Sequence, residues 1–406
     1  MVDNRRVVKT LFVILSEIVL GCNKSESGLA LPLVRDSLGV SIVSNPMRES
    51  KVPTIGITFD SSITIDGVEL LRAKSARWLG PRTGVVFDQA SSEVFLFDLP
   101  TGRMRRIGDQ GDGPGEFRVI GNVYVCGRDS IAVYGLPTRL ALFDSAGRFV
   151  REHQMALLKR GLHGVTLDCS AVLGVETRRS ANGVRDRDIL VFALGIMQGN
   201  GTSVVAEALS PARGTVLFHG RSVRLPIPFS AFPVWAFRDS LLYLGNGDTP
   251  EVRVYNQAGI LIRIIRWETK PMPLTQADHD SYERIRSELD ERVGKGTKED
   301  FPPLREFDLP TLKPVYNEFL VTEEGQLWVQ EYPRIWEGFI RLFGNSLSEG
   351  ASRWWVFSAS GMLVGRVVIP KGVMVTDVRK GMILGVWSDS SDIQHIRLLK
   401  LAEGVR

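Results

Sequence analysis

A short pattern that recurs four times along the 406 residues limits the fold more than any other feature. In each copy an apolar segment ends in an aromatic residue, and a tight turn containing Gly leads into a second apolar segment. The copies lie at residues 96–103, 142–148, 254–260 and 356–362. A polar residue followed by Gly fits a hairpin turn that requires a positive φ at the Gly. The pattern therefore favours antiparallel strands joined by tight turns.

A second pair of apolar segments lies ahead of each copy, so that each unit holds four antiparallel strands. Units of four strands and about 45 residues are typical of the blades of a β-propeller. Two weaker units at residues 165–192 and 373–399 bring the number of blades to six. The last unit lacks one strand. We expect a strand between Ile55 and Ile65 to complete it, because an open ring would leave unpaired edges.

The predicted fold is therefore all-β, a six-bladed β-propeller over residues 54–406 with one helical insertion between blades at about residues 270–314. Thr275 and Asp278 form a capping box at the start of this helix. Tyr282, Ile285, Leu289 and Val293 then form one apolar stripe. The insertion either builds a wall around the mouth of the central channel, or its helix plugs that channel or covers the edge of a blade.

The first 22 residues have the features of an export signal. A basic start with Arg5, Arg6 and Lys9 precedes an apolar run, which is far shorter than the ~20 residues of a membrane-spanning helix. Residues 19–22 resemble the bacterial lipobox, in which the thiol of the Cys, here Cys22, is acylated. Glu17 departs from that pattern, so a plain secretory signal and a chance Cys stay open as alternatives. Residues 23–53 are predicted to be a tether and lead-in.

Residues 108–117 contain four glycines and link the first and second units. The motif from Gly111 to Phe117, followed by a strand, resembles the junction in NHL-type propellers. Together with the lead-in at residues 36–46, it makes the chain similar to six-bladed propeller lipoproteins of bacteria. The resemblance implies a fold and an exported, membrane-anchored state, but no general activity. Here the Gly-rich junction occurs only once, which departs from the family.

Candidate ligand-binding residues lie in two predicted loops. Asp109, Asp112 and Glu116 could bind Ca²⁺ or another divalent metal. Alternatively, their backbone amides could cradle an anion, or the glycines serve only the backbone while the acids are solvated. Trp336 could stack on a sugar, and Arg341 lies on the same loop, whereas Trp328, Trp354 and Trp355 are expected to pack within blades.

The charge, the histidines and the cysteines argue against several classes of function. The net charge of +4 comes without a Lys/Arg cluster, so nucleic acid is not an expected partner. The five histidines are scattered, and neither a Cys-x-x-Cys spacing nor a Gly-x-Ser-x-Gly elbow occurs. Cys126 and Cys169 could pair in an oxidising compartment, but we expect free buried thiols.

We therefore predict a membrane-anchored protein of the cell envelope, on the periplasmic or cell-surface side. It would bind a protein, peptide or glycan through the face where the blade junctions emerge, with no cofactor and no catalytic residue assigned. A metal-dependent hydrolase or lyase, with its site at the channel mouth, is the alternative. A structural component of an envelope complex is a third hypothesis.

Overall fold

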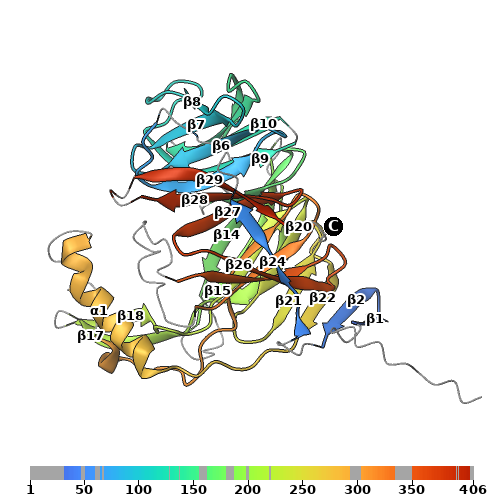
Figure 1. Ribbon diagram of the computed structural model, residues 1–406, viewed down its shortest axis with the longest axis vertical. Coiled ribbons are helices and arrows are strands. Elements are labelled where there is room, and N and C mark those ends of the chain that lie inside the picture. Colours follow the sequence, from blue (N-terminus) through green and yellow to red (C-terminus); the bar gives the residue numbers. More distant parts are fainter. Residues whose placement is uncertain are drawn as a thin grey trace, which may run out of the picture.

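Six sheets of four to six strands form the body of the computed structural model (Figure 1). The structure describes residues 32–46, 51–59, 65, 68–127, 129–136, 138–154, 162–179, 187–197, 201–218, 221–292, 303–333, 350–389, 391 and 393–402. Each sheet is one blade, which confirms the six-bladed all-β fold that the repeats predict.

The first three blades each contain four strands in chain order. Blade one consists of β5 (Ala73–Trp78), β6 (Thr83–Asp88), β7 (Glu93–Asp98) and β8 (Arg103–Ile107). Blade two consists of β9 (Val119–Cys126), β10 (Ser130–Leu136), β11 (Arg139–Asp144) and β12 (Phe149–His153). Blade three consists of β13 (Leu162–Val165), β14 (Ala171–Arg178), β15 (Ile189–Ile196) and β16 (Thr202–Leu209).

The last three blades combine their own strands with strands from the N-terminal segment. Blade four contains β19 (Val234–Arg238), β20 (Leu241–Gly245), β21 (Glu251–Tyr255) and β22 (Leu261–Trp267). Blade five contains β23 (Tyr316–Val321), β24 (Leu327–Glu331), β25 (Ser352–Phe357) and β26 (Leu363–Ile369). Blade six contains β27 (Val373–Arg379), β28 (Met382–Ser388) and β29 (Gln394–Leu401).

The described residues from 32 to 59 form what we call the N-terminal strap, which covers the outer edges of these three blades in turn. In it, β1 (Leu33–Ser37) pairs with β2 (Val40–Asn45), and β2 runs parallel to β22. Next, β3 (Thr54–Ile55) runs parallel to β26, and β4 (Ile57–Phe59) pairs antiparallel with β29. The closing strand that we expected after Ile55 is therefore β4. Residues 33–45, which lie in the predicted tether and lead-in, form strands of blade four.

Apolar clusters between neighbouring blades make up the core. Trp328 and Trp354 of blade five, for example, pack against Val378 and Ile383 of blade six. Trp328 and Trp354 are at most 1% exposed, and Trp355 lies in the cluster between blades four and five. The expected role of these three Trp side chains in blade packing is confirmed, so they offer no surface for stacking on a sugar.

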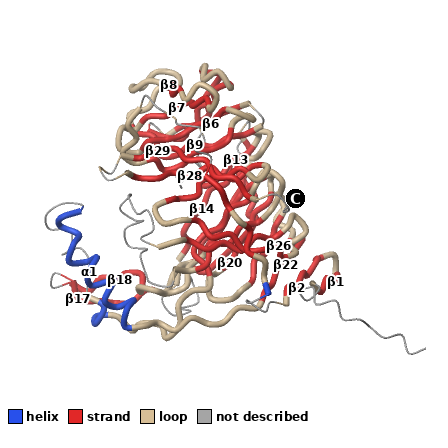
Figure 2. The backbone as a smooth tube through the Cα atoms, in the orientation of Figure 1, coloured by secondary structure: helices blue, strands red, loops and turns tan. Residues whose placement is uncertain are grey.

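Two insertions emerge at junctions between blades and lie to one side of the ring (Figure 2). The hairpin of β17 (Arg213–Phe218) and β18 (Arg221–Pro226) precedes blade four, and α1 (Gln276–Arg292) precedes blade five. A short 3-10 helix, Leu304–Glu306, follows α1. Phe229, Tyr282, Ile285, Leu304 and Tyr332 bury one another and hold these segments together.

The predicted capping box is present at the start of α1. The Thr275 backbone N–H donates to the Asp278 carboxylate at 2.9 Å, and the Thr275 hydroxyl donates to it at 2.6 Å. The Lys313 Nζ lies 3.0 Å from both carboxylate oxygens of Asp278, and both side chains are almost fully buried. This ion pair fastens the helix to the segment that enters blade five.

Candidate functional site: a cavity in the central channel

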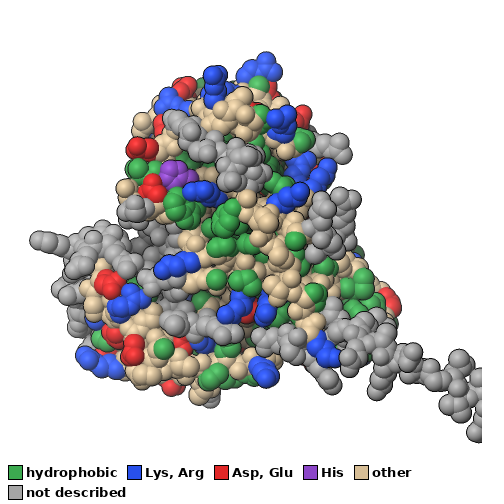
Figure 3. All heavy atoms as spheres, in the orientation of Figure 1, with side chains coloured by type: hydrophobic (Ala, Val, Ile, Leu, Met, Phe, Trp, Pro, Cys, Tyr) green, Lys and Arg blue, Asp and Glu red, His purple; other side chains and the backbone are tan. Residues whose placement is uncertain are grey.

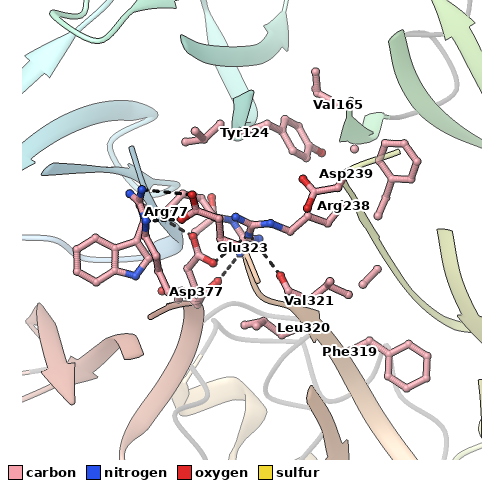
Figure 4. A pocket seen from close by; sticks show the side chains of 18 of the residues that line it. Arg77, Tyr124, Val165, Arg238, Asp239, Phe319, Leu320, Val321, Glu323 and Asp377 are labelled. Atoms are coloured by element: carbon pink, nitrogen blue, oxygen red, sulfur yellow. Dashed lines mark hydrogen bonds and ion pairs between the residues drawn. The ribbon is translucent and has the colours of Figure 1, made fainter. Parts of the chain in front are cut away.

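The first strand of each blade lies innermost, and these six strands are neighbours around the ring: β5, β9, β13, β19, β23 and β27. Between them lies a cavity of about 490 Å³ that takes lining residues from all six blades (Figure 4). Its lining includes turn residues beyond the strand ends, such as Gly127, Leu167, Asp239 and Glu323. The cavity therefore reaches one end of the channel. The binding face was predicted at the other end, where the blade junctions emerge.

β-Bulges explain how polar side chains come to line this cavity. The strand register shifts between Ala73 and Ser75, between Leu162 and Gly164, and between Val375 and Asp377. A bulge inserts one extra residue and redirects its side chain. The three extra residues, which all line the cavity, are Lys74, His163 and Thr376.

Gly164, beside the second bulge, is required for close packing. A Cβ atom at this position would lie 2.6 Å from the Phe237 ring of the next blade, a distance at which atoms clash. The absence of a side chain therefore lets β13 approach β19 closely, and His163 next to it is held against blade four.

An ion pair across the channel ties several blades together. The Arg238 Nη1 lies 3.3 Å from the Asp377 carboxylate and donates to the Val321 carbonyl, also at 3.3 Å (Figure 4). Asp377 is buried and accepts a second hydrogen bond, of 3.0 Å, from the Trp78 backbone N–H. Blades one, four and six thus meet at the Asp377 carboxylate, and Arg238 adds a contact to blade five, which fixes its guanidinium in the channel.

A second ion pair closes the gap between blades five and six. Arg379 pairs with Glu323, and one of its Nη atoms donates to the Glu323 carboxylate at 3.3 Å. Arg77 of blade one donates instead to the Thr376 backbone carbonyl. Two of the channel arginines are therefore neutralised by carboxylates, and Arg77 is not.

The walls of the channel change the acidity of the groups that face it. Burial lowers the pKa of His163, whose ring lies edge-on to Trp235 with the centroids 5.4 Å apart, so this imidazole is neutral at pH 7. Burial raises the pKa of Asp239, Arg238 acts against that rise, and Glu323 adds to it. Burial, and then Arg72, lowers the pKa of Lys74.

The three acidic residues of the Gly-rich junction, residues 108–117, each have a local partner. Asp109 pairs with Arg106 at 3.3 Å, and Asp112 pairs with Arg118 at 2.5 Å. The Glu116 carboxylate accepts the Gly113 N–H at 2.8 Å, so that the loop folds onto itself. Trp336, Arg341 and Cys22 lie outside the described residues.

The expectation of two free buried thiols is wrong. Cys126, the last residue of β9, forms a disulfide with Cys169, in the turn after β13. The Gly127 N–H also donates to the Leu167 carbonyl beside it. The disulfide therefore joins blades two and three at the wall of the cavity.

The charged residues of the channel are not among the candidate residues predicted from the sequence. One available signal was the segment from Arg72 to Arg77, which places three cations within six residues of a strand otherwise made of small residues. Another was the Arg238–Asp239 pair at the end of an apolar strand. Neither signal reveals the channel unless the innermost strand of each blade is known.

Within the described part of the chain, no three His, Cys, Asp or Glu side chains lie close enough together to hold a metal ion. In the same residues, no helix has both the length and the apolar character needed to span a membrane. Figure 3 shows Lys and Arg mixed with Asp and Glu across the face in view, without a continuous tract of one sign.

Comparisons with known proteins give structural likenesses only. The sequence matches no protein-family model and no curated protein. One solved structure is that of a Bacteroides fragilis protein whose name describes it as exported. It has 10% identity and a TM-score of 0.48, with 89% of this chain and 100% of that chain covered. A member of the DUF4221 family from Bacteroides vulgatus has 10% identity and a TM-score of 0.49, with 86% and 98% covered.

A third solved structure is a Bacteroides thetaiotaomicron protein of unknown function, with 10% identity, a TM-score of 0.43, and 86% of this chain and 76% of that chain covered. These likenesses are too distant to suggest an activity. We therefore infer the function from the residues that line the channel.

Proposed function

We propose that this propeller is a binding module of the cell envelope that holds a peptide in its central channel. The cavity of about 490 Å³ carries this proposal. Small-molecule and cofactor sites in proteins are usually concave and occupy roughly 300–1,000 Å³. A cavity walled by six rigid sheets is also formed in advance, so little ordering is needed when a ligand binds.

The charges in the cavity favour a peptide over a neutral glycan. Lys74 and Arg77 on blade one are cationic, whereas Asp239 and Glu318 on blades four and five are acidic. Blade one stands opposite blade four in a ring of six, so Lys74 and Arg77 face Asp239 across the channel. A peptide carries both carboxylate and ammonium groups and can satisfy both walls.

Export of the protein and its anchoring through a lipid on Cys22 belong to the same proposal. The Cys126–Cys169 disulfide supports it, because structural disulfides persist in oxidising compartments outside the cytoplasm. We expect Cys22→Ser to move the protein from the membrane fraction to the soluble fraction of the envelope. Recovery of that variant in the membrane fraction would argue against the lipid anchor.

The alternative of a metal-dependent hydrolase or lyase needs several ligating side chains at one place. The acids of the Gly-rich junction are each engaged by a separate partner, and no observation on the described residues favours this alternative. We therefore propose the binding role alone.

The test is calorimetric titration of the purified full-length protein with panels of short peptides and of neutral oligosaccharides. The two matched variants are Met374→Trp and Met382→Trp. Both methionines are half-buried against the same apolar cluster, but only Met374 lines the cavity. We expect a peptide to bind, with affinity lowered at least about tenfold by Met374→Trp and unchanged by Met382→Trp.

Three results would contradict this proposal. Binding of oligosaccharides alone would replace the peptide with a glycan. Peptide binding that Met374→Trp leaves intact would move the site out of the channel. Failure of both panels to bind would remove the binding role. Thermal melting of both variants would confirm that they are folded.

A further inference from the structure

Two cations of the channel wall have no acidic partner. Lys74 and Arg77 both lie on β5, the innermost strand of blade one. No described residue accepts a hydrogen bond from the Lys74 ammonium or forms an ion pair with it. Arg77 donates to the Thr376 backbone carbonyl and pairs with no carboxylate among the described residues. This wall of the cavity therefore carries positive charge that the protein itself does not neutralise.

The other two arginines of the cavity provide the contrast. Arg238 pairs with Asp377 and Arg379 pairs with Glu323. A cation that lines a cavity without a partner attracts anions, because low-dielectric walls around the cavity focus its electric field. Burial and the nearby Arg72 both lower the pKa of Lys74, and no carboxylate acts in the other direction. The cations of this wall, which no carboxylate neutralises, can therefore attract an anion into the cavity.

We propose that Lys74 and Arg77 bind a carboxylate group of the peptide, an inference that rests on the proposed function. Lysine supplies a compact ammonium, and the guanidinium of arginine matches the geometry of a carboxylate. A phosphate carries more negative charge, and the acids of the opposite wall would repel it more strongly. The carboxylate is either the C-terminus of the peptide or an Asp or Glu side chain.

The opposite wall fits the rest of such a ligand. Asp239 lies at the end of β19 with a positive φ of 51°, and its carboxylate faces the cavity (Figure 4). No hydrogen bond or ion pair joins that carboxylate to another described side chain. It can accept N–H groups or the ammonium of a peptide whose carboxylate lies at blade one. The ligand is thus oriented by charge along the line from blade one to blade four.

The experiment uses three versions of one short peptide: the free C-terminal acid, the C-terminal amide, and an amide with an Asp side chain. Each is titrated by calorimetry into the full-length protein and three variants. Lys74→Met removes one of the two channel cations without an acidic partner, Lys74→Arg keeps the charge, and Lys400→Met is a matched control at an exposed position of β29, away from the cavity.

We expect the wild-type protein to bind at least one of the two carboxylate peptides about tenfold more tightly than the plain amide. Lys74→Met should abolish that preference, Lys74→Arg should retain it, and Lys400→Met should leave it unchanged. The acid and the Asp-containing amide distinguish the two sources of the carboxylate.

Three outcomes would overturn the inference. If all three peptides bind equally well and Met374→Trp weakens them, the channel binds peptides without a carboxylate site. The proposed function would then survive while this inference fails. If a carboxylate preference persists in Lys74→Met, the anion is bound elsewhere. If no peptide binds at all, both proposals fall.

Discussion

At the scale of single residues, Asn45 joins the N-terminal strap to two blades. Its Nδ2 donates to the carbonyls of Arg266 and Gly361, both at 3.0 Å, and its Oδ1 accepts the Leu363 N–H at 2.8 Å. The side chain is 2% exposed. The Asn45 side-chain amide thus supplies hydrogen-bond partners to backbone groups of both blade four and blade five, in place of water.

Replacing Asn45 by Ala should therefore destabilise the protein by about 2–3 kcal/mol, because three buried backbone groups lose their partner. Urea unfolding followed by tryptophan fluorescence measures this change. Asn246→Ala is the control, since Asn246 is exposed and its side chain accepts only the Thr249 hydroxyl. Equal midpoints for the two variants would contradict the role of Asn45.

His163 has a predictable effect on the pH dependence of stability. Burial lowers its pKa in the folded protein, so the unfolded chain binds a proton more readily. Stability therefore falls as the pH drops below the unfolded value of about 6.5. In His163→Gln, the loss of stability between pH 7 and pH 5 should be smaller than in the wild type, as measured by urea unfolding at each pH.

His163→Phe should behave like His163→Gln, because the effect comes from titration and not from a hydrogen bond. A loss of stability on acidification that is the same in the wild type and both variants would show that His163 titrates normally. That result would also remove the evidence for a desolvated channel wall at blade three.

At the scale of elements, the placement of α1 depends on one buried ion pair. Asp278 caps the helix and pairs with Lys313, and their side chains are 0% and 3% exposed. Removing one member of a buried pair leaves an uncompensated charge. Burial raises the pKa of Asp278, but hydrogen bonds from Thr275 and Lys313 outweigh it and keep the pKa below its usual value, so the carboxylate stays charged.

We expect Lys313→Met to lower the local stability of α1 by about 3 kcal/mol, which is roughly a hundredfold loss of amide protection. Hydrogen exchange followed by mass spectrometry measures this. Lys270→Met, at an exposed position ahead of the helix, should have no effect. Adding Asp278→Asn to Lys313→Met should recover part of the loss. If protection in Lys313→Met equals that of the wild type, the pair does not hold the helix.

The outer edges of the blades differ between the two halves of the ring. Blades four to six are covered by the strap, whereas β8 and β12 end their sheets without a further partner strand among the described residues. Arg103, Arg105 and Arg106 occupy β8 and are exposed. Charged side chains on an open edge discourage pairing with another chain. This explains a local run of arginines that would otherwise suggest a binding patch.

At the scale of the whole molecule, the ring is closed from its N-terminal end. The strap supplies the fourth strand of blade six, the fifth strand of blade five, and the fifth and sixth strands of blade four. Val52 and Ile55 of the strap, each 6% exposed, are buried in the clusters that join blade five to its neighbours. The ring therefore depends on residues that precede its first blade.

A chain that begins at Arg72 should be less stable than the full chain by more than about 4 kcal/mol. It loses three strand pairings with blades four to six and the buried apolar side chains of Ile42, Val43, Val52, Ile55, Ile65 and Leu70. A chain that begins at Val40 lacks only β1, whose side chains are all exposed, and should retain nearly all of the stability. Urea unfolding of both truncated chains distinguishes them. Equal stability would mean that the strap does not close the ring.

Much of this architecture was predictable because it depends on local chemistry. In the four recurring copies the turn contains a Gly with positive φ, and Gly102, Gly147, Gly259 and Gly361 have φ values of 64°, 71°, 75° and 91°. The alternation of strands and turns, the number of blades and the capping box of α1 follow from residues close together in the sequence. The prediction of six blades with one helical insertion was therefore confirmed.

The channel cavity, our proposed binding site, was not predictable in the same way, because its lining residues come from six strands spread over 300 residues and more. Arg238 and Asp377 are 139 positions apart, and nothing in either segment points to the other. The pairing of Cys126 with Cys169 also depends on how closely blades two and three approach. The expectation of free thiols was wrong because spacing along the chain does not measure that approach.

By itself, the sequence determined the strands, their turns and the number of blades, since these depend on hydrophobic alternation and on backbone conformations that few residues adopt. Only the tertiary structure decided which side chains share the channel, which cations are left without a carboxylate, and which edges the strap covers. Those outcomes depend on distances between segments that closing the ring brings together, and on the bulges that turn Lys74 and His163 toward its axis.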